Sequence, residues 1–389
     1  MDRRLVLLWV TGAAARVSLL AVPPLIPEMH RDLDLAETAV GALTGLPVLL
    51  LSIGGLVGSL VIARVGPRRA AIAGLAVIAV AGALRGVGPS VAGLFAMTIV
   101  MAAGVALTQL AIPPLVAVWE PDNVGRATAV YSNGMLAGEI AGAALTGTVV
   151  LALVGGSWER ALAVWSILVV AVAVALVRGP EVVHARAAAA WWPDWTDGRM
   201  WIVGLTLASA SIAYWGGNAH VPDYLHALGR GDDVAVALAS LNGFQVPASL
   251  LVAVWPGLFV ARRWPLLAAG IVALAAAVGL VLLPAANAAW TGAIGFVAAF
   301  GFVLALALPP LLAPPNEVHR FAAGVFAIGF GSAFAAAVIA GALWDATGIP
   351  TMALFPVVVA GALMLVLGSR LTLAGVPVAG AAVAPTADP

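Results

Sequence analysis

The sequence contains no cysteine and few charged residues. The lack of cysteine excludes disulfide bonds, thiolate metal sites and thiol-based catalysis. Charged residues make up 9% of the chain, whereas a water-soluble protein carries about a quarter. The 18 basic residues, all arginine, balance 18 acidic ones, so the chain lacks the basic excess typical of nucleic-acid-binding proteins. These shortages argue against a soluble domain and against a nucleic-acid partner.

Apolar residues dominate the chain instead. Of its 389 residues 63% are hydrophobic, and the mean hydropathy is +1.08. An apolar run of about 20 residues is long enough to cross a bilayer as a helix. We predict twelve such spans, at about 5–27, 38–63, 69–88, 91–118, 126–154, 159–177, 200–226, 233–260, 265–284, 288–312, 320–345 and 350–372. The sequence therefore predicts an all-α membrane protein with twelve transmembrane helices.

One long polar connection divides these spans into six and six. We predict an N-terminal six-helix bundle over 1–177, a central cytoplasmic loop over 178–199, a C-terminal six-helix bundle over 200–373 and a flexible cytoplasmic tail over 374–389. With an internal N-terminus, three arginines fall in outer segments, namely Arg31, Arg160 and Arg230. The inner segments hold Arg3, Arg4, Arg64, Arg68, Arg69, Arg126, Arg178, Arg186, Arg199, Arg262, Arg263, Arg320 and Arg370. Because basic residues stay cytoplasmic, we expect a multi-pass protein of the cytoplasmic membrane with both termini inside.

The two halves also share short motifs at a nearly constant offset. The matching pairs are 43–45 (LTG) with 241–243 (LNG), 110–115 (LAIPPL) with 306–311 (LALPPL), and 22–23 (VP) with 221–222 (VP). The offsets are close to half the chain length, so the halves are predicted to be parallel, pseudo-symmetric repeats. Parallel six-helix repeats joined by a central loop are typical of the major facilitator superfamily, in which two bundles rock about a site at the membrane midplane.

The chain thus resembles this superfamily over its whole length. The segment 64–69 (RVGPRR) is similar to the signature loop of the superfamily, which implies a gating role for Arg64 and Arg68. It departs from that pattern at Ala63, where the family has an aspartate, so the usual ion pair of this loop is in question. Within the superfamily, the chain resembles the branch of cyanate and nitroimidazole transporters. That resemblance rests on Arg16, Pro23, Pro27, the segments 43–47 and 82–85, Gly104, Gln109, Pro113, Tyr214, Val221 and Pro222.

A transporter of this kind needs polar side chains at the midplane. The candidates are Arg16, Gln109, Asn133 and Glu139 in the first half and Tyr214, Trp215, Asn218, Asn242 and Gln245 in the second. We assign Glu139 to coupling or to an ion pair, and the others except Asn133 to substrate binding. For Asn242 and Gln245, hydrogen bonding between helices is an equal alternative. His220, Asp223 and His226 are expected at the outer mouth, and we expect no metal site.

Arg16 is the strongest candidate because it is a charge near the midplane. Its planar fork of donors suits a small anion such as a carboxylate, nitrate or cyanate. The alternative is a permanent ion pair with Glu139, which lies at a similar depth, and both roles combine if substrate displaces Glu139. Glu139 would then be a candidate for proton coupling. Arg85 is expected to reach the outer interface.

Proline pairs lie near the inner ends of the fourth and tenth spans, and we expect them to act as kinks at an inner gate. They are Pro113, Pro114, Pro309 and Pro310. Taken together, the sequence predicts a monomeric secondary transporter that moves a small anion or small planar polar solute by alternating access, with Arg16 as main anchor. Efflux of small neutral heteroaromatics such as nitroimidazoles is the alternative. We expect no enzyme and no channel, no cofactor apart from protons, and no partners beyond the solute and the bilayer.

Overall fold

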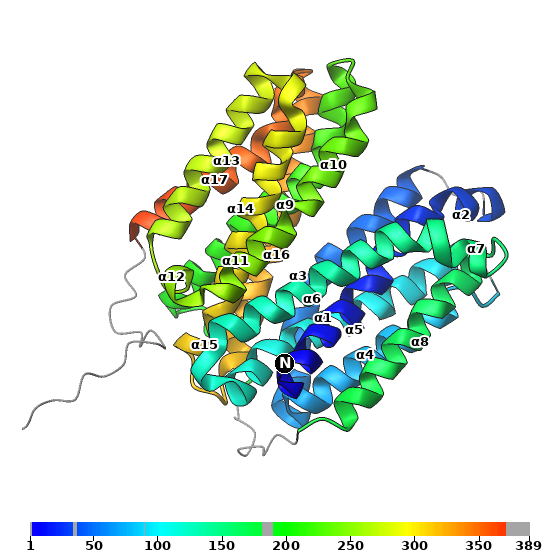
Figure 1. Cartoon of the computed structure of the whole chain (residues 1–389), viewed down its shortest axis with the longest axis vertical. Coiled ribbons are helices and arrows are strands. Elements are labelled where there is room, and N and C mark those ends of the chain that lie inside the picture. The colour runs from blue at the N-terminus through cyan, green and yellow to red at the C-terminus, as the bar shows by residue number, and fades with distance from the viewer. Residues whose placement is uncertain (1, 34–36, 89, 181–189, 371–389) are drawn as a thin grey trace, which may run out of the picture.

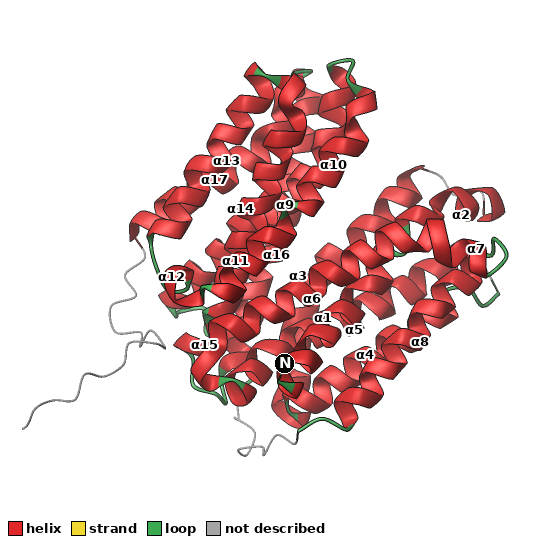
Figure 2. Cartoon of the chain, viewed as in Figure 1, coloured by secondary structure: helices red, strands yellow, loops and turns green. Residues whose placement is uncertain are grey.

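The computed structural model describes residues 2–33, 37–88, 90–180 and 190–370. Within these ranges every regular element is helical and none is a strand (Figures 1 and 2). The predicted all-α fold is therefore confirmed. The predicted tail over 374–389 and residues 181–189 of the predicted central loop lie outside the described residues.

The first half of the chain begins with a long helix and continues through five more spans. Its elements are α1 (Arg3–Leu20), η1 (Pro23–Leu25), α2 (Ile26–Leu33), α3 (Glu37–Val65), α4 (Pro67–Leu84), α5 (Val91–Trp119), η2 (Pro121–Asn123), α6 (Val124–Leu145), η3 (Thr146–Val150), α7 (Leu151–Leu153) and α8 (Trp158–Val177). We call α1–α8 the first helix group.

The second half repeats this pattern with more interruptions. Its elements are α9 (Gly198–Ala227), η4 (Gly231–Asp233), α10 (Val234–Gly243), α11 (Gln245–Val254), α12 (Pro256–Phe259), α13 (Trp264–Leu282), η5 (Pro284–Ala286), α14 (Asn287–Ala307), α15 (Pro309–Leu312), α16 (Val318–Thr347), η6 (Pro350–Leu354) and α17 (Phe355–Arg370). We call α9–α17 the second helix group.

Eleven spans among the described residues are long and apolar enough to cross a membrane, one fewer than predicted. The seventh predicted span forms α9, a helix of 30 residues that does not reach the same hydropathy. Its polar and aromatic side chains, which include Tyr214, Trp215 and Asn218, lower its average. The helix that a hydropathy criterion misses is thus the one that carries several of the site candidates.

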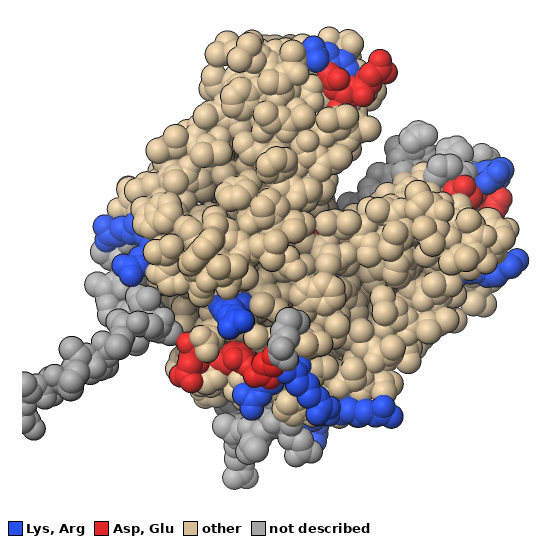
Figure 3. Space-filling view, in the orientation of Figure 1, with Lys and Arg blue, Asp and Glu red and all other residues tan. Residues whose placement is uncertain are grey.

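The two helix groups meet at one end and diverge at the other (Figure 1). They meet at what we call the arginine-rich end, where basic side chains gather on the surface (Figure 3). The helices that begin or end there carry Arg4, Arg64, Arg68, Arg126 and Arg320 close to those ends. There α3 packs on α16 and α6 packs on α11. At the opposite end the surface is hollowed between the groups (Figure 3).

Hydrogen bonds cross between the groups in the half nearer the arginine-rich end. Ser52 Oγ donates to the carbonyl oxygen of Ala327 at 3.1 Å. Asn133 Nδ2 donates to Ser249 Oγ, also at 3.1 Å. Asn133 is one of the site candidates, and it also accepts from Trp9 Nε1 of α1 at 2.9 Å, so its side chain connects α6 to both α1 and α11.

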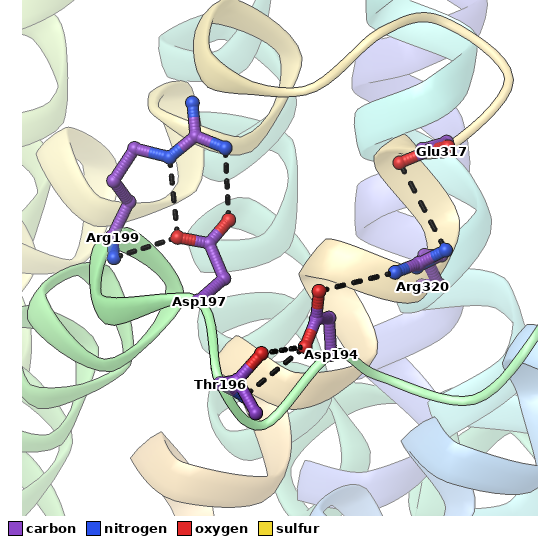
Figure 4. A network of polar contacts seen from close by, with 6 residues as sticks. All are labelled: Asp194, Thr196, Asp197, Arg199, Glu317 and Arg320. Carbon is purple, nitrogen blue, oxygen red and sulfur yellow. Dashed lines mark hydrogen bonds and ion pairs between the residues drawn. The ribbon is translucent and has the colours of Figure 1, made fainter.

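The segment 191–194 of the predicted central loop contacts both groups at this end. Ser59 Oγ of α3 donates to the carbonyl oxygen of Trp191 at 2.6 Å. Asp194 pairs with Arg320 of α16 at 3.7 Å, and Arg320 also faces Glu317 (Figure 4). Hydrogen bonds from the hydroxyl and backbone N–H of Thr196 lower the pKa of Asp194, and Arg320 lowers it further. The segment therefore connects the two groups at the arginine-rich end, through a hydrogen bond to α3 and an ionised carboxylate paired with α16.

Helices α1 and α6 pack unusually closely because small residues line their contact. Gly134, Gly138 and Gly142 repeat every fourth residue on one face of α6. A Cβ atom on Gly138 would collide with the carbonyl oxygen of Ala13, and one on Gly134 would collide with that of Trp9. This close approach sets the distance between polar side chains on the two helices.

Arg85 contradicts the expectation that it reaches the outer interface. Its side chain is 2% exposed, and its Nη2 donates to the carbonyl oxygen of Ser18 at 3.0 Å. Ser18 lies in the last turn of α1, where carbonyl groups lack helical partners and the helix dipole favours a cation. Arg85 Nη2 therefore caps the end of α1, while its Nε and Nη1 are buried without a partner among the described residues.

The proline pairs behave differently in the two groups. Helix α5 continues through Pro113 and Pro114 to Trp119. In the second group α14 ends at Ala307, and Pro309 and Pro310 begin the separate helix α15. Helix α15 packs against α5, so both pairs lie in the half nearer the arginine-rich end.

Candidate functional site

A pocket lies between the two helix groups. Both groups contribute side chains to its wall. The lining residues are Arg16, Ser132, Met135, Leu136 and Glu139 from the first group and Ala210, Ser211, Tyr214, Trp215, Gln245, Ala298, Ala299, Phe302, Val303 and Phe330 from the second. The wall is thus largely apolar and aromatic, with a few polar groups, which is the usual character of a small-molecule site.

The charged part of the wall is an ion pair. Arg16 Nη1 lies 3.3 Å from Glu139 Oε1, and the two side chains are 3% and 12% exposed. On the other side Arg16 Nη2 donates to Gln109 Oε1 at 3.0 Å. The third guanidinium nitrogen, Arg16 Nε, is buried and has no partner among the described residues. A buried cation is tolerated here because a carboxylate neutralises it and an amide fills a second position.

Tyr214 connects this ion pair to the second helix group. Its hydroxyl lies 3.4 Å from Glu139 Oε2 and 3.2 Å from Asn242 Oδ1. Gln245 Nε2 donates to the same Asn242 oxygen at 3.2 Å. Asn242 Nδ2 donates to Asn218 Oδ1 at 3.0 Å. A continuous row of polar side chains therefore runs from α1 through α6 and α9 to α10.

The amide side chains of this row flank an interruption in the eighth predicted span. Helix α10 ends at Gly243 and α11 begins at Gln245. Pro247 has no backbone N–H, so it cannot bond to the carbonyl group of Gly243 and continue the helix. Asn242 and Gln245 lie on either side of the interruption. Gln245 donates across it to the Asn242 oxygen that faces Tyr214.

Aromatic rings form another part of the wall. The rings of Tyr214 and Trp215 contact edge to face, with centroids 5.0 Å apart and an angle of 70°. Phe302 and Phe330 lie on the same cavity. Such a surface offers π-faces against which a flat solute can pack.

Two serine hydroxyls of the wall were not predicted from the sequence. Ser132 Oγ and Ser211 Oγ are buried and have no hydrogen-bond partner among the described residues. Their helical spacing was the available signal, since Ser132 precedes Glu139 by seven residues and Ser211 precedes Tyr214 by three. Both residues line the pocket, so their hydroxyls are spare hydrogen-bonding groups in its wall.

The predicted substrate-binding residues divide into two sets. Arg16, Tyr214, Trp215 and Gln245 lie on the cavity wall together with Glu139. The remaining three stand behind the wall and hold its members by hydrogen bonds; they are Gln109, Asn218 and Asn242.

The predicted gating arginines lie away from the cavity. Arg64 is exposed in the last turn of α3. Arg68 donates to the carbonyl oxygens of Leu176, Val177 and Gly179, all within the first half of the chain. In this arrangement Arg68 fixes the end of α8 rather than bridging the two groups.

The histidines near the other end form no metal cluster within the described ranges. His220 contacts the carbonyl oxygen of Ala337 at 3.0 Å through Nε2. Asp223 and His226 are exposed, as expected for residues at a mouth.

Comparison of the sequence with known proteins identifies its relatives. Residues 8–338 match the model of the Major Facilitator Superfamily. The chain is 27% identical over 362 residues to a 2-nitroimidazole transporter of Escherichia coli (strain K12), a match that covers 91% of each chain. It is 26% identical over 372 residues to an uncharacterized transporter of Bacillus subtilis (strain 168), which covers 91% of this chain and 89% of that protein.

Solved structures share the fold at low sequence identity. The outward conformation of the transporter FucP superimposes with a TM-score of 0.74 at 13% identity, covering 95% of this chain and 100% of the FucP chain. The human organic anion transporter MFSD10 gives the same TM-score of 0.74 at 13% identity, covering 95% of this chain and 99% of that one.

Proposed function

This chain belongs to the Major Facilitator Superfamily, and on that premise we propose that it moves a small planar polar solute across the cytoplasmic membrane by alternating access. The arginine-rich end would face the cytoplasm together with both termini, following the bias of basic residues. The hollow between the groups then opens outward (Figure 3). Each chain carries a complete cavity, which supports function as a monomer.

The solute that fits this cavity best is neutral and heteroaromatic. One observation carries this choice: the charge of Arg16 is balanced by Glu139 inside a wall rich in aromatic rings. A net-neutral site does not need an anion to compensate a cation. The resemblance to a 2-nitroimidazole transporter supports the same class of solute.

The polar groups of the wall suggest how such a solute would be oriented. A flat ring would pack on Trp215, while acceptor oxygens of a nitro-like group would bond to the Arg16 guanidinium, which lines the same pocket. The hydroxyls of Ser132 and Ser211 would bond to ring or substituent atoms. These bonds would fill donors that the protein itself leaves unused.

A small anion such as cyanate is a second candidate, supported by the Arg16 guanidinium, which lines the pocket. An anion would compete with Glu139 for the guanidinium. The displaced carboxylate would then lose its counter-charge and favour proton uptake. Anion transport by this route would be accompanied by a proton.

A thermal-shift screen separates these candidates, because a ligand of the folded state raises its apparent stability. We expect 2-nitroimidazole to raise the unfolding temperature of wild type and of the control Arg230→Ala, which alters an ion pair outside the cavity. Trp215→Ala should lose this effect. Stabilisation by small anions that disappears in Arg16→Ala would instead make the anion the substrate. If neither class stabilises the wild type, the proposed solute class is wrong.

A further inference from the structure

We propose that Tyr214 and Asn242 form a relay through which the protonation state of Glu139 acts on the second helix group. This inference rests on the proposed function, because it describes how that same site is coupled to movement. Tyr214 is a positioning residue in this scheme, and Glu139 is the group that exchanges the proton.

The orientation of Asn242 is fixed by its neighbours. Its Nδ2 donates to Asn218 Oδ1 and to the carbonyl oxygen of Leu238, at 3.0 and 2.9 Å. Asn218 is itself oriented, because its Nδ2 donates to the carbonyl oxygen of Tyr214 at 2.9 Å. Asn242 Oδ1 therefore faces Tyr214 as an acceptor.

The Tyr214 hydroxyl thus lies between two acceptors when Glu139 is ionised. Its single proton can bond to the carboxylate or to the Asn242 oxygen, at 3.4 and 3.2 Å, but not fully to both. Either the contact with Glu139 or the contact with Asn242 is therefore not a hydrogen bond. The hydrogen-bonded link from Glu139 on α6 to Asn242 on α10 is then interrupted at Tyr214.

A proton on Glu139 Oε2 removes this shortage. The carboxyl O–H donates to the Tyr214 oxygen, and the Tyr214 O–H donates to Asn242 Oδ1. The proton arrives from water in the cavity, which Glu139 lines, and no other group changes its charge. Both contacts become hydrogen bonds, so the link from α6 through α9 to α10 is complete. The ion pair of Arg16 with Glu139 Oε1 becomes a hydrogen bond to a neutral carboxyl, while the completed link favours the arrangement that is open away from the arginine-rich end.

Few other groups facing Glu139 carry charge or titrate. Arg16 approaches it from α1 and Tyr214 from α9. On the cavity wall, α11 presents the neutral Gln245 and α14 presents apolar side chains. From α5, Gln109 contacts Arg16 and not the carboxylate. A pH response between the helix groups at this depth is therefore assigned to Glu139.

The absence of cysteine allows a direct test with paired spin labels. Leu153→Cys and Leu283→Cys place labels at exposed sites, 80% and 60% accessible, on either side of the open end. In the wild-type background we expect acid to increase the population of long distances. Glu139→Gln should show long distances at every pH, because its amide N–H donates to Tyr214 permanently. Tyr214→Phe should lose the pH response.

Tyr224→Phe is the matched control, since it removes a hydroxyl from the same helix that bonds only to the carbonyl oxygen of Leu280. It should respond to pH as the wild type does. A Tyr214→Phe variant that follows the wild-type pH profile would overturn the relay, as would a wild-type distance that ignores pH. The effect of 2-nitroimidazole on the unfolding temperature of Tyr214→Phe is measured separately. If the solute stabilises this variant while the pH response is unchanged, the relay is wrong but the proposed function stands.

Discussion

Arg16 and Glu139 depend on each other, because each neutralises a charge that is buried in the interior. Removing one partner of a buried pair costs about 3–5 kcal/mol, whereas replacing both with apolar residues is often nearly neutral. We therefore expect Arg16→Leu and Glu139→Leu to lower the unfolding temperature, and the double variant to recover most of the loss. Thermal unfolding in detergent checks this. Equal unfolding temperatures for all four proteins would mean that the pair contributes no stability.

Single residues could be predicted from the sequence when they carried a chemical signal. Arg16 and Glu139 stood out as charges at one depth, and Tyr214 and Trp215 as polar aromatics in an apolar run. Ser132, Ser211 and Phe330 did not, because serine and phenylalanine are common in membrane helices. Arg85 was misplaced because the sequence does not show which helix end its guanidinium will cap.

At the scale of elements, the contact between α1 and α6 depends on glycine. Gly138→Val would force the helices apart, and overpacking of this kind costs about 1–3 kcal/mol. We expect a lower unfolding temperature and weaker binding of solute, since the Arg16–Glu139 distance follows the helix spacing. Gly198→Ala is the control, because a Cβ atom there meets nothing within 4 Å. Gly138→Val with wild-type stability would contradict the close packing.

The positions of the elements were largely predictable, and their interruptions were not. The predicted apolar runs matched all the spans, and the run at 200–226 matched α9 although that helix falls short of the hydropathy of the other eleven. The break between α10 and α11 was missed because glycine and proline are common within membrane helices and do not by themselves end one. The sequence also did not predict that α5 is continuous while α14 and α15 are separate, because both regions carry the same proline pair.

At the scale of the whole molecule, the segment 191–194 should restrain opening of the arginine-rich end. Val260, buried there against Gly125, reports this opening when replaced by cysteine. We expect Arg320→Gln to raise the labelling rate of Val260→Cys by a few-fold. The control Arg199→Gln should not, because its partner Asp197 is its near neighbour in sequence. Equal rates would show that the segment does not hold this end.

The pH dependence of that restraint follows from Asp194. Its pKa is lowered, so its pairing is fully present above the ordinary carboxyl range and is lost only as pH falls through the lowered value. The effect of Arg320→Gln on labelling should therefore stay constant over neutral and mildly acidic pH. A loss of that effect in mildly acidic solution would contradict an ionised Asp194.

The measurement that tests the account most directly is exchange of radiolabelled 2-nitroimidazole by proteoliposomes. Wild-type protein should exchange the solute across the membrane faster than protein-free liposomes. The Arg16→Leu, Glu139→Leu double variant should remain folded but exchange no faster than the empty vesicles, because its cavity has lost the polar groups that orient the solute. Exchange by the double variant at the wild-type rate would contradict a transport path through this site, and no exchange by the wild type would contradict the proposed solute.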